Sequence, residues 1–404
     1  MATVRPLTAW LPPADLVSEI ASVPYDVVDS REARELASGK PRSYLHVIRP
    51  EIDLPVGVDL YSAPVYAKAA ENLERWLRET PFHTTDAPAL FVYRLIRQGR
   101  SQVGVVGACS VDEYDAGGIA IHERTRQNKE DDRTRHVVTM RCQAEPIFLG
   151  YRAVPVIDAL VRDAMEVEPR FDFVADDGVQ HTLWDVSDPA TLAAAFEAVP
   201  RLYVADGHHR AKSASRARQE LAAANPAHTG AEPYNFVLSV VFPDDQLAIL
   251  PYNRVVTDLS GMSAADALTR IGAIAPLEPT DSAQPPARGT VCVFADGQWY
   301  RGTLPDGGPA VVDTLDCAVL QDHILGPVFG ITDPRTDNRI DFVGGIRGTE
   351  ELAQRATAAG GIAFSMFATS LAELFAVADG GEIMPPKSTW FEPKLRSGMF
   401  IHRI

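Results

Sequence analysis

Apolar residues recur along the chain with two different periods, and each period predicts one kind of secondary structure. In residues 63–80 the apolar side chains from Tyr66 to Leu77 recur at helical spacing, which predicts an amphipathic helix. Residues 89–114 instead hold two runs rich in β-branched and aromatic residues on either side of Gly99. That pattern predicts a β-hairpin.

Further segments continue this alternation of helices and strands. Additional predicted elements are a helix capped by Asp29 with Glu32 three residues on, a strand at 42–51, a hairpin turning at Asp177-Gly178, a helix at 190–199, buried strands at 234–243 and 248–256, a strand pair around Asp296-Gly297 and a helix at 370–378 closed by Gly380-Gly381. Because strands and helices interleave throughout, the fold class is α+β, or mixed α/β.

The chain is long enough for about two or three cores. Residues 278–289, EPTDSAQPPARG, are typical of a linker or an exposed loop, so we expect a soft boundary nearby. We therefore predict an N-terminal α/β region at 1–118, a core region at 119–275 and a C-terminal α/β region at 276–404.

Composition and charge narrow the class of protein. The 46% apolar content is that of an ordinary folded protein, and no stretch approaches the ~20 apolar residues of a membrane span. The four cysteines lie far apart, which argues against a zinc site or a disulfide scaffold, and the first 20 residues lack the layout of a secretory signal. We expect a cytoplasmic protein that does not interact with membranes.

The net charge of −16 argues against a nucleic-acid-binding protein, because phosphate backbones are held by clustered Lys and Arg. A local basic pocket is still compatible with this charge. The expected partner is a small anionic metabolite or a nucleotide, and the sequence leaves open whether the chain forms a homo-oligomer.

Residues 202–220, LYVADGHHRAKSASRARQE, contain the highest concentration of side chains that are candidates for binding or catalysis. Four apolar residues predict a buried strand, Gly207 permits a turn with positive φ, and a helix follows. The free amides of the first helical turn and the positive end of the helix dipole favour an anion. The candidate residues of this corner are Asp206, Gly207, His208, His209, Arg210, Lys212 and Ser213.

Two other interpretations of this corner stay open. The imidazoles of the two histidines could bond only to the backbone of a capped helix. A metal site is the third interpretation, although residues adjacent in sequence do not face one another on a helix.

Residues 119–141 are dense in charge of both signs. The plain interpretation is a solvated helix face with i,i+4 pairs such as Arg126–Glu130 or Asp131–Arg135. The functional interpretation gives the residues different roles. In it, Glu123 is a candidate general base, Arg126 and Arg133 are phosphate ligands, and Asp131 and Asp132 hold Mg²⁺.

The tail MPPKSTWFEPK places Lys387, Ser388 and Thr389 after a rigid proline pair, which is either a surface loop or an oxyanion-binding set. Tyr25-Asp26 is a weaker candidate, for which a plain turn is the preferred interpretation.

Several of these segments together resemble a known family. The stretches ADGHHRAKSA, HERTRQNKEDDR, LHVIRPEIDLP and MPPKSTWFEPK are similar to the bacterial domain-of-unknown-function family 1015 over nearly the whole chain. The shorter stretch from Asp206 to Arg210 resembles the phosphate-contacting motif of the ParB/sulfiredoxin superfamily, particularly its free-serine kinases. This resemblance implies a ParB/sulfiredoxin-like core with N- and C-terminal extensions, and phosphate contact by residues 207–210.

The prediction is therefore a kinase-like phosphotransferase acting on a small hydroxylated metabolite, free serine or phosphoserine, with Mg²⁺ and ATP, ADP or another phosphoryl donor. The proton acceptor is either Glu123 or Asp206, while His208, His209 and Arg210 neutralise the transferring oxygens. A phosphate-ester hydrolase, a nucleotide-binding or DNA-associated regulator and a metal-dependent oxidoreductase remain as alternatives.

Overall fold

The computed structural model describes residues 2–404 and divides the chain into two compact units. Unit 1 comprises Met1–Ile121, Thr125–Leu247 and Pro393–Ile404, and unit 2 comprises His122–Arg124 and Ala248–Glu392. Residues on both sides of the boundary predicted at 118/119 thus share one unit. The chain passes into unit 2 near residue 248, and the region predicted as 276–404 is divided between the units.

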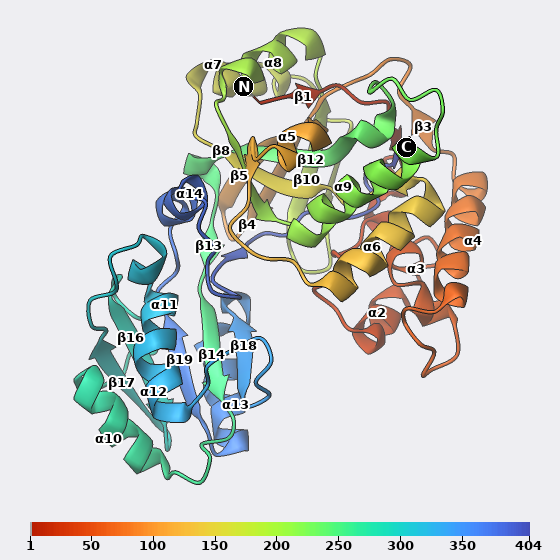
Figure 1. The fold of residues 1–404 in the computed structure, drawn as a ribbon. Helices are drawn as coiled ribbons and strands as arrows, with labels where there is room; N and C mark the ends of the chain where they lie inside the picture. The colour runs from red at the N-terminus through yellow and green to blue at the C-terminus, as the bar shows by residue number, and fades with distance from the viewer. Residues whose placement is uncertain (1) are drawn as a thin grey trace. The chain divides into compact units, whose positions relative to one another are not determined.

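Among the described residues, unit 1 is built on a nine-stranded mixed sheet with the order β6-β11-β8-β12-β5-β4-β10-β9 and with β1 paired to β5 (Figure 1). Its strands are β1 (Val4–Arg5), β4 (Phe91–Arg97), β5 (Arg100–Ser110), β6 (Ile119–Ala120), β8 (Ile147–Tyr151), β9 (Phe171–Val174), β10 (Gln180–Asp185), β11 (Leu202–Asp206) and β12 (Phe236–Pro243). Two short pairs join β2 (Trp10–Leu11) to β3 (His83–Thr84) and β7 (Cys142–Gln143) to β21 (His402–Arg403).

Long-range strand pairing explains why residues on both sides of position 118 share one unit. The central strand β12 pairs with β5 in antiparallel register and with β8 in parallel register. The sheet therefore joins residues from both sides of position 118. The two predicted hairpins of this sheet are confirmed: Gln98 and Gly99 have positive φ between β4 and β5, and Gly178 has positive φ between β9 and β10.

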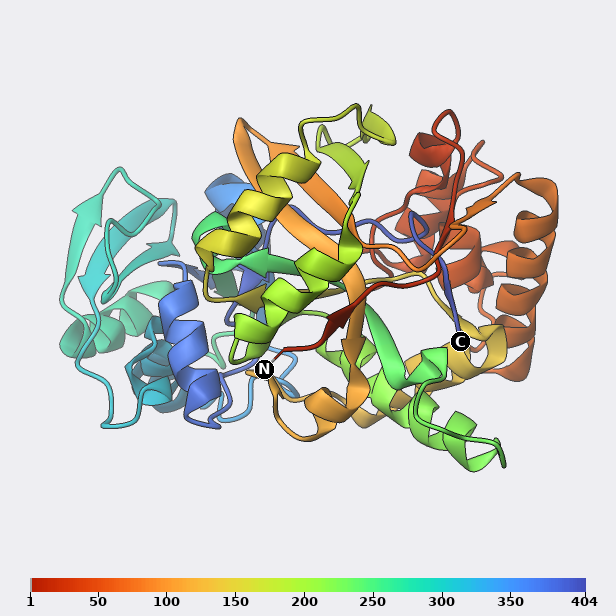
Figure 2. The same ribbon diagram turned by 90° about the horizontal axis from the view of Figure 1, so that it is seen from above.

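Helices pack on this sheet and on one another. They are α1 (Val17–Ile20), α2 (Ser30–Ala37), α3 (Leu45–Ile48), α4 (Ala63–Glu79), α5 (Val111–Asp115), α6 (Gln127–Met140), α7 (Pro155–Ala164), α8 (Pro189–Ala195) and α9 (His208–Ala223). Helices α6 and α9 lie side by side (Figure 1). Helices α1–α4, red to orange in Figure 2, gather at one end of unit 1 around a core that includes Leu45, Leu73 and Trp76 and that α6 and the C-terminal segment complete.

Unit 2 has a six-stranded sheet with the order β15-β17-β16-β19-β14-β18. Its strands are β14 (Tyr252–Val256), β15 (Leu277–Thr280), β16 (Thr290–Ala295), β17 (Gln298–Thr303), β18 (Ile340–Gly344) and β19 (Ile362–Met366), and a separate pair joins β13 (Ile249–Leu250) to β20 (Trp390–Phe391). Its helices are α10 (Ala264–Ile274), α11 (Asp316–Leu320), α12 (Gly326–Phe329), α13 (Gly348–Ala359) and α14 (Leu371–Asp379).

Alternating side chains divide the core of unit 2 into two layers. Val256 joins the layer beneath α10–α12, and its neighbour Val255 joins the layer beneath α13. This is the period of two that a strand covered on both faces requires. The predicted hairpin at Asp296-Gly297 and the predicted helix ended by Gly380 are confirmed.

The strand predicted at 42–51 is wrong. Those residues form α3 and a 3₁₀ turn at Pro50–Asp53. The prediction of a mixed α/β protein is confirmed by both sheets and their helices. Within residues 2–404, no helix combines the length and the apolar character that a membrane crossing needs.

Candidate functional site

The turn between β11 and α9 in unit 1 has the backbone geometry that the sequence predicts. Gly207 precedes the first helical residue with φ of 96° and ψ of 31°, so the predicted positive φ is confirmed. A β-carbon at this position would lie 2.9 Å from Cζ of Arg210. The first-turn amides have no acceptor within the helix, and the glycine N-cap offers no side chain to cap them.

Arg210 is held by the protein's own acceptors. Its side chain is buried, with Nη1 donating to the carbonyl of Pro146 at 2.5 Å and Nη2 donating to Asp206 Oδ2 at 3.1 Å. Because both ends of the guanidinium are occupied, Arg210 fixes the corner and is not oriented to neutralise a ligand. This differs from the role predicted from sequence.

Asp206 is likewise engaged. Lys394 Nζ lies 3.4 Å from its Oδ1, opposite the bond from Arg210. Burial opposes ionisation of this carboxyl, but Lys394 and Arg210 outweigh it and hold the pKa of Asp206 well below its usual range. A carboxylate that binds protons so weakly is a poor general base, which argues against Asp206 as the predicted proton acceptor.

His209 is half-buried and oriented by its backbone neighbour. The amide of Arg126 donates to Nε2 of His209 at 3.0 Å. Because Nε2 accepts this bond, the ring proton of the neutral imidazole lies on Nδ1. Burial lowers the pKa of His209, and the charge of Asp26 only partly opposes this effect. His209 therefore offers a neutral N–H donor, and Arg126 contributes its backbone to the corner.

Asp26, which the sequence analysis ranked only as a weaker candidate, is an acidic group beside this corner. Asp26 is exposed at a turn, next to the buried Tyr25, and its charge acts on both His209 and Arg210. None of the described residues forms a hydrogen bond or an ion pair with its carboxylate. Nothing in the pattern around Pro24-Tyr25-Asp26 distinguished it from an ordinary turn, since the two side chains on which its charge acts are about 180 residues away in the chain.

Arg133 and Asp132 of α6 form a buried network beneath the turn at Tyr25. Arg133 Nε donates to Asp132 Oδ2 at 2.9 Å, and its guanidinium lies 4.4 Å from the centre of the Tyr25 ring. The hydroxyl of Tyr66 donates to Asp132 Oδ1 at 2.8 Å. Both side chains are thus used internally, Arg133 as a stacked ion-pair partner and Asp132 as its counter-ion.

The two carboxylates predicted to hold Mg²⁺ do not converge. Asp131 is exposed and lies 2.7 Å from Nη2 of Arg216, whereas Asp132 is buried against Arg133. Neighbouring residues of a helix point about 100° apart, so one ion cannot bridge this pair. The pairing of Asp131 is across to α9, in place of the i,i+4 pair with Arg135 that the sequence suggested.

A small cavity lies among the buried charges of unit 1. Its volume is about 30 Å³, and Tyr44, Arg133, Glu145 and Arg210 line it. One polar atom of each of these four side chains is buried with no hydrogen-bond partner in the described residues. The cavity is large enough for a water molecule, which needs roughly 10–15 Å³, and too small for a metabolite. Burial raises the pKa of Glu145, although Arg133 and Arg210 act against this.

Two further residues of α9 that were predicted to bind phosphate lie in different surroundings. Ser213 is fully buried, and its hydroxyl donates to the carbonyl of Glu130 at 3.4 Å, so it joins α9 to α6. Lys212 is half-buried and forms no hydrogen bond or ion pair with another described residue. The hydroxyl of Ser213 is therefore not free to bind a phosphate, whereas the ammonium group of Lys212 is.

His208, the first residue of α9, is buried in unit 1. The other predicted residues belong to unit 2. Glu123 lies there in the short segment 122–124. Ser388 is buried, and its hydroxyl donates to the carbonyl of Pro385 at 2.6 Å. Thr389 Oγ1 lies 3.3 Å from His122 Nε2, and Lys387 Nζ lies 5.3 Å from the centre of the Tyr252 ring. The hydroxyls of this tail thus have internal partners.

Comparison with known proteins identifies a family. Residues 4–318 match the family described as "Protein of unknown function (DUF1015)". The search of curated proteins gives no match.

Several solved structures are weakly similar. A free serine kinase in complex with AMP is 14% identical with a TM-score of 0.36, over 71% of this chain and 86% of that chain. A conserved hypothetical protein from Pyrococcus furiosus is 14% identical with a TM-score of 0.37, over 74% and 95%. SbnI with a C-terminal truncation, from Staphylococcus aureus, is 13% identical with a TM-score of 0.35, over 71% and 82%. Because these TM-scores and identities are low, we draw no conclusion from the likenesses.

Proposed function

The chain belongs to the DUF1015 family, whose description assigns no activity, and from the corner at Gly207 we propose that it is a kinase-like phosphotransferase acting on a small hydroxylated metabolite. The observation that carries this proposal is the juxtaposition of three features in unit 1. They are the uncapped first turn of α9, the N–H donor of His209 and the exposed carboxylate of Asp26.

In this proposal the amides at the start of α9 bind phosphate oxygens. An uncapped helix N-terminus combines unpaired N–H groups with the positive end of the helix dipole, and both favour an anion. His209 donates from Nδ1, and Gly207 lets the backbone approach the ligand closely, since it has no side chain. Arg210 and Lys394 hold Asp206, and through it the end of β11, in place.

Asp26 is the proposed proton acceptor. The hydroxyl oxygen of the metabolite attacks phosphorus, the bond from phosphorus to the leaving oxygen of the donor breaks, and the hydroxyl proton passes to the carboxylate. Asp26 suits this role better than Asp206, because it is exposed and unpaired among the described residues. Glu123 remains the alternative from the sequence.

The substrate class rests on the sequence motif. Its similarity to the free-serine kinases of the ParB/sulfiredoxin superfamily suggests free serine as acceptor, ATP or ADP as donor and a core of that fold. Mg²⁺ is expected for such chemistry, but Asp131 and Asp132 point apart on α6 and do not fit it.

The decisive measurement is ligand binding followed by turnover. We would record the thermal unfolding of the full chain with AMP, ADP, ATP and pyrophosphate, each with and without Mg²⁺. A ligand at a hundredfold excess over its dissociation constant stabilises the folded form by about 2.7 kcal/mol. The ligands that stabilise are then incubated with free serine, and phosphoserine is measured by ³¹P NMR.

We expect Asp26→Asn to lower turnover by on the order of 10²-fold or more while nucleotide binding persists, since a general base contributes that much. Asp86→Asn is the matched control, because Asp86 is also an exposed loop carboxylate with no partner among the described residues. Equal turnover in the two variants would remove Asp26 from the mechanism. Release of inorganic phosphate without an acceptor would favour a hydrolase.

A further inference from the structure

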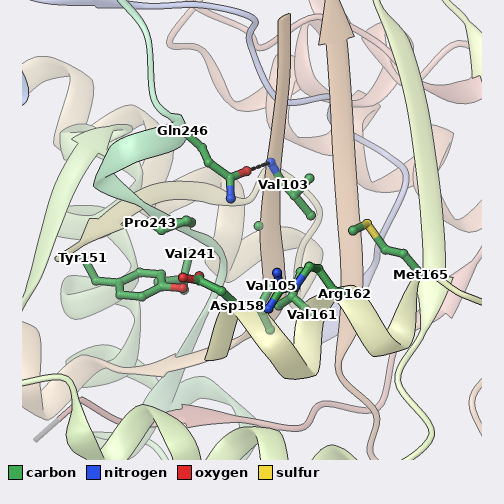
Figure 3. A pocket seen from close by; sticks show the side chains of 11 residues that line it. Val103, Val105, Tyr151, Asp158, Val161, Arg162, Met165, Val241, Pro243 and Gln246 are labelled. Atoms are coloured by element: carbon green, nitrogen blue, oxygen red, sulfur yellow. Dashed lines mark hydrogen bonds between the residues drawn. The ribbon is translucent and has the colours of Figure 1, made fainter. Parts of the chain in front are cut away.

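A second pocket of unit 1 lies between helix α7 and the sheet (Figure 3). Its volume is about 190 Å³, enough for a small organic molecule. Apolar side chains from β5, β12, α7 and the residue after α7 make most of its wall: Val103, Val105, Val161, Met165 and Val241. The pocket is separate from the corner at Gly207, because no residue from 206 to 210 lines it.

Polar groups enter this apolar pocket at a few points. The carboxylate of Asp158 and the hydroxyl of Tyr151 face each other across one side of it (Figure 3). Neither group forms a hydrogen bond or an ion pair with another residue in the described range. Gln246 is held on the other side, where its Oε1 accepts from the amide of Val103 at 2.9 Å.

The negative charge of Asp158 has an acidic neighbour as well as a basic one. Burial and the neighbouring Asp245 raise its pKa, and only Arg162, one turn later on α7, acts in the opposite direction. Asp244 accepts from the amide of Ala153 at 3.0 Å and is thereby engaged. Burial and these carboxylates also raise the pKa of Tyr151, so its hydroxyl keeps its proton.

We propose that this pocket binds a small primary amine in its ammonium form, carrying a short branched apolar chain. The ammonium donates to Asp158 and to the oxygen of Tyr151, and the apolar chain packs on the valines of β5 and β12. Arg162 also lines the pocket, but it forms no ion pair with Asp158, so the half-buried carboxylate still has oxygens free to accept from a ligand. A charge-assisted bond from an ammonium is stronger than one from an uncharged donor, and a carboxylate ligand would be repelled by Asp158. This site goes beyond the proposed phosphotransferase and does not depend on it.

The test compares three probes that share one carbon skeleton. Isopentylamine, isopentanol and isovalerate are titrated into the full chain at neutral pH, and binding is followed by ¹H–¹⁵N NMR and by calorimetry. We expect isopentylamine to shift the amide signals of residues 103–105 and 158–165, and to bind at least tenfold more tightly than either other probe. Equal binding of isopentanol, or no binding of the amine at tens of millimolar, would overturn the proposal.

Two variants separate recognition from folding. Asp158→Asn keeps the shape of the side chain and is expected to weaken amine binding at least tenfold, and Tyr151→Phe is expected to weaken it severalfold. Asp163→Asn, an exposed position on the same helix outside the pocket, should bind like the wild type. If Asp158→Asn and Asp163→Asn bind the amine equally well and both are folded by NMR, the carboxylate does not recognise the ligand.

Discussion

Single residues decide the shape of the corner between β11 and α9, and Gly207 is the most constrained of them. We expect Gly207→Ala to destabilise the fold by more than the about 1–2 kcal/mol that left-handed backbone costs a residue with a β-carbon. The added carbon would also displace the Arg210 guanidinium, which lies 2.9 Å from its position. Urea unfolding gives the free energy of unfolding of the variant.

Gly178→Ala separates the two contributions. Gly178 has φ of 77° in the β9–β10 hairpin, and a β-carbon there would meet nothing within 4 Å. It should therefore show the backbone cost alone. If the two variants lose the same free energy of unfolding, the contact with Arg210 contributes nothing.

The sequence could identify Gly207 but not the partners of its neighbours. An apolar run ended by Asp-Gly before a helix-forming segment specifies a turn locally. The acceptors of Arg210 at Pro146 and the cation beside Asp206 at Lys394 lie 64 and 188 positions away in the chain. Contacts of that kind depend on the completed sheet, so Arg210 was assigned to a ligand and Asp26 to a plain turn.

Elements with a strong local pattern were predictable, and one with a weak pattern was not. Helix α4 has a clear helical period, and the hairpins at Gly99 and Gly178 have turn residues that fix them. The run at 45–48 is short, apolar and partly β-branched, which suits a strand as well as a buried helix. In the fold, the backbone amide of Tyr44 donates to the carbonyl of Ile20 and the side-chain amide of Asn72 donates to that of His46, and these contacts hold the run in a helical turn.

At the scale of a helix end, Asp316, the first residue of α11, makes the stability of the fold depend on pH. Burial and Glu373 raise the pKa of Asp316 to about 6, against the hydrogen bond from the amide of Gly289. Between the pKa of the unfolded chain and the raised pKa of the folded state, this acid is protonated in the folded state and ionised in the unfolded chain. Its contribution to stability is therefore complete below its unfolded pKa, about 4, and is lost as the pH rises to about 6 and above.

We expect Asp316→Asn to remove this contribution, so that the variant loses less stability than the wild type between about pH 4 and pH 7. The midpoint of thermal unfolding measured across that range tests this. Asp281→Asn, an exposed position of unit 2, serves as control and should follow the wild type. Parallel curves for Asp316→Asn and the wild type would show that Asp316 titrates normally.

For the whole molecule, the sequence predicted that the chain forms more than one compact region, but it did not predict which residues belong to each. The proline-rich stretch at 278–289 was a reasonable boundary by composition, yet it begins within β15 and leads to β16 of the same sheet in unit 2. Unit 1 is completed only by residues 393–404, where Lys394 pairs with Asp206 and β21 pairs with β7. A local pattern cannot reveal that the last residues return to the unit that contains the first.

Because the two units have separate cores, we expect each unit to unfold independently of the other. Phe364 of β19 is fully buried in the core of unit 2, and Phe364→Ala should cost that unit about 3–5 kcal/mol. Unit 1 has cores that include none of these residues, so its amides should keep their protection. Native-state hydrogen exchange tests this directly: faster exchange is expected in β14, β16 and β19, with unchanged exchange in β5 and β12. Equal acceleration in both sheets would mean that the chain unfolds as one cooperative unit.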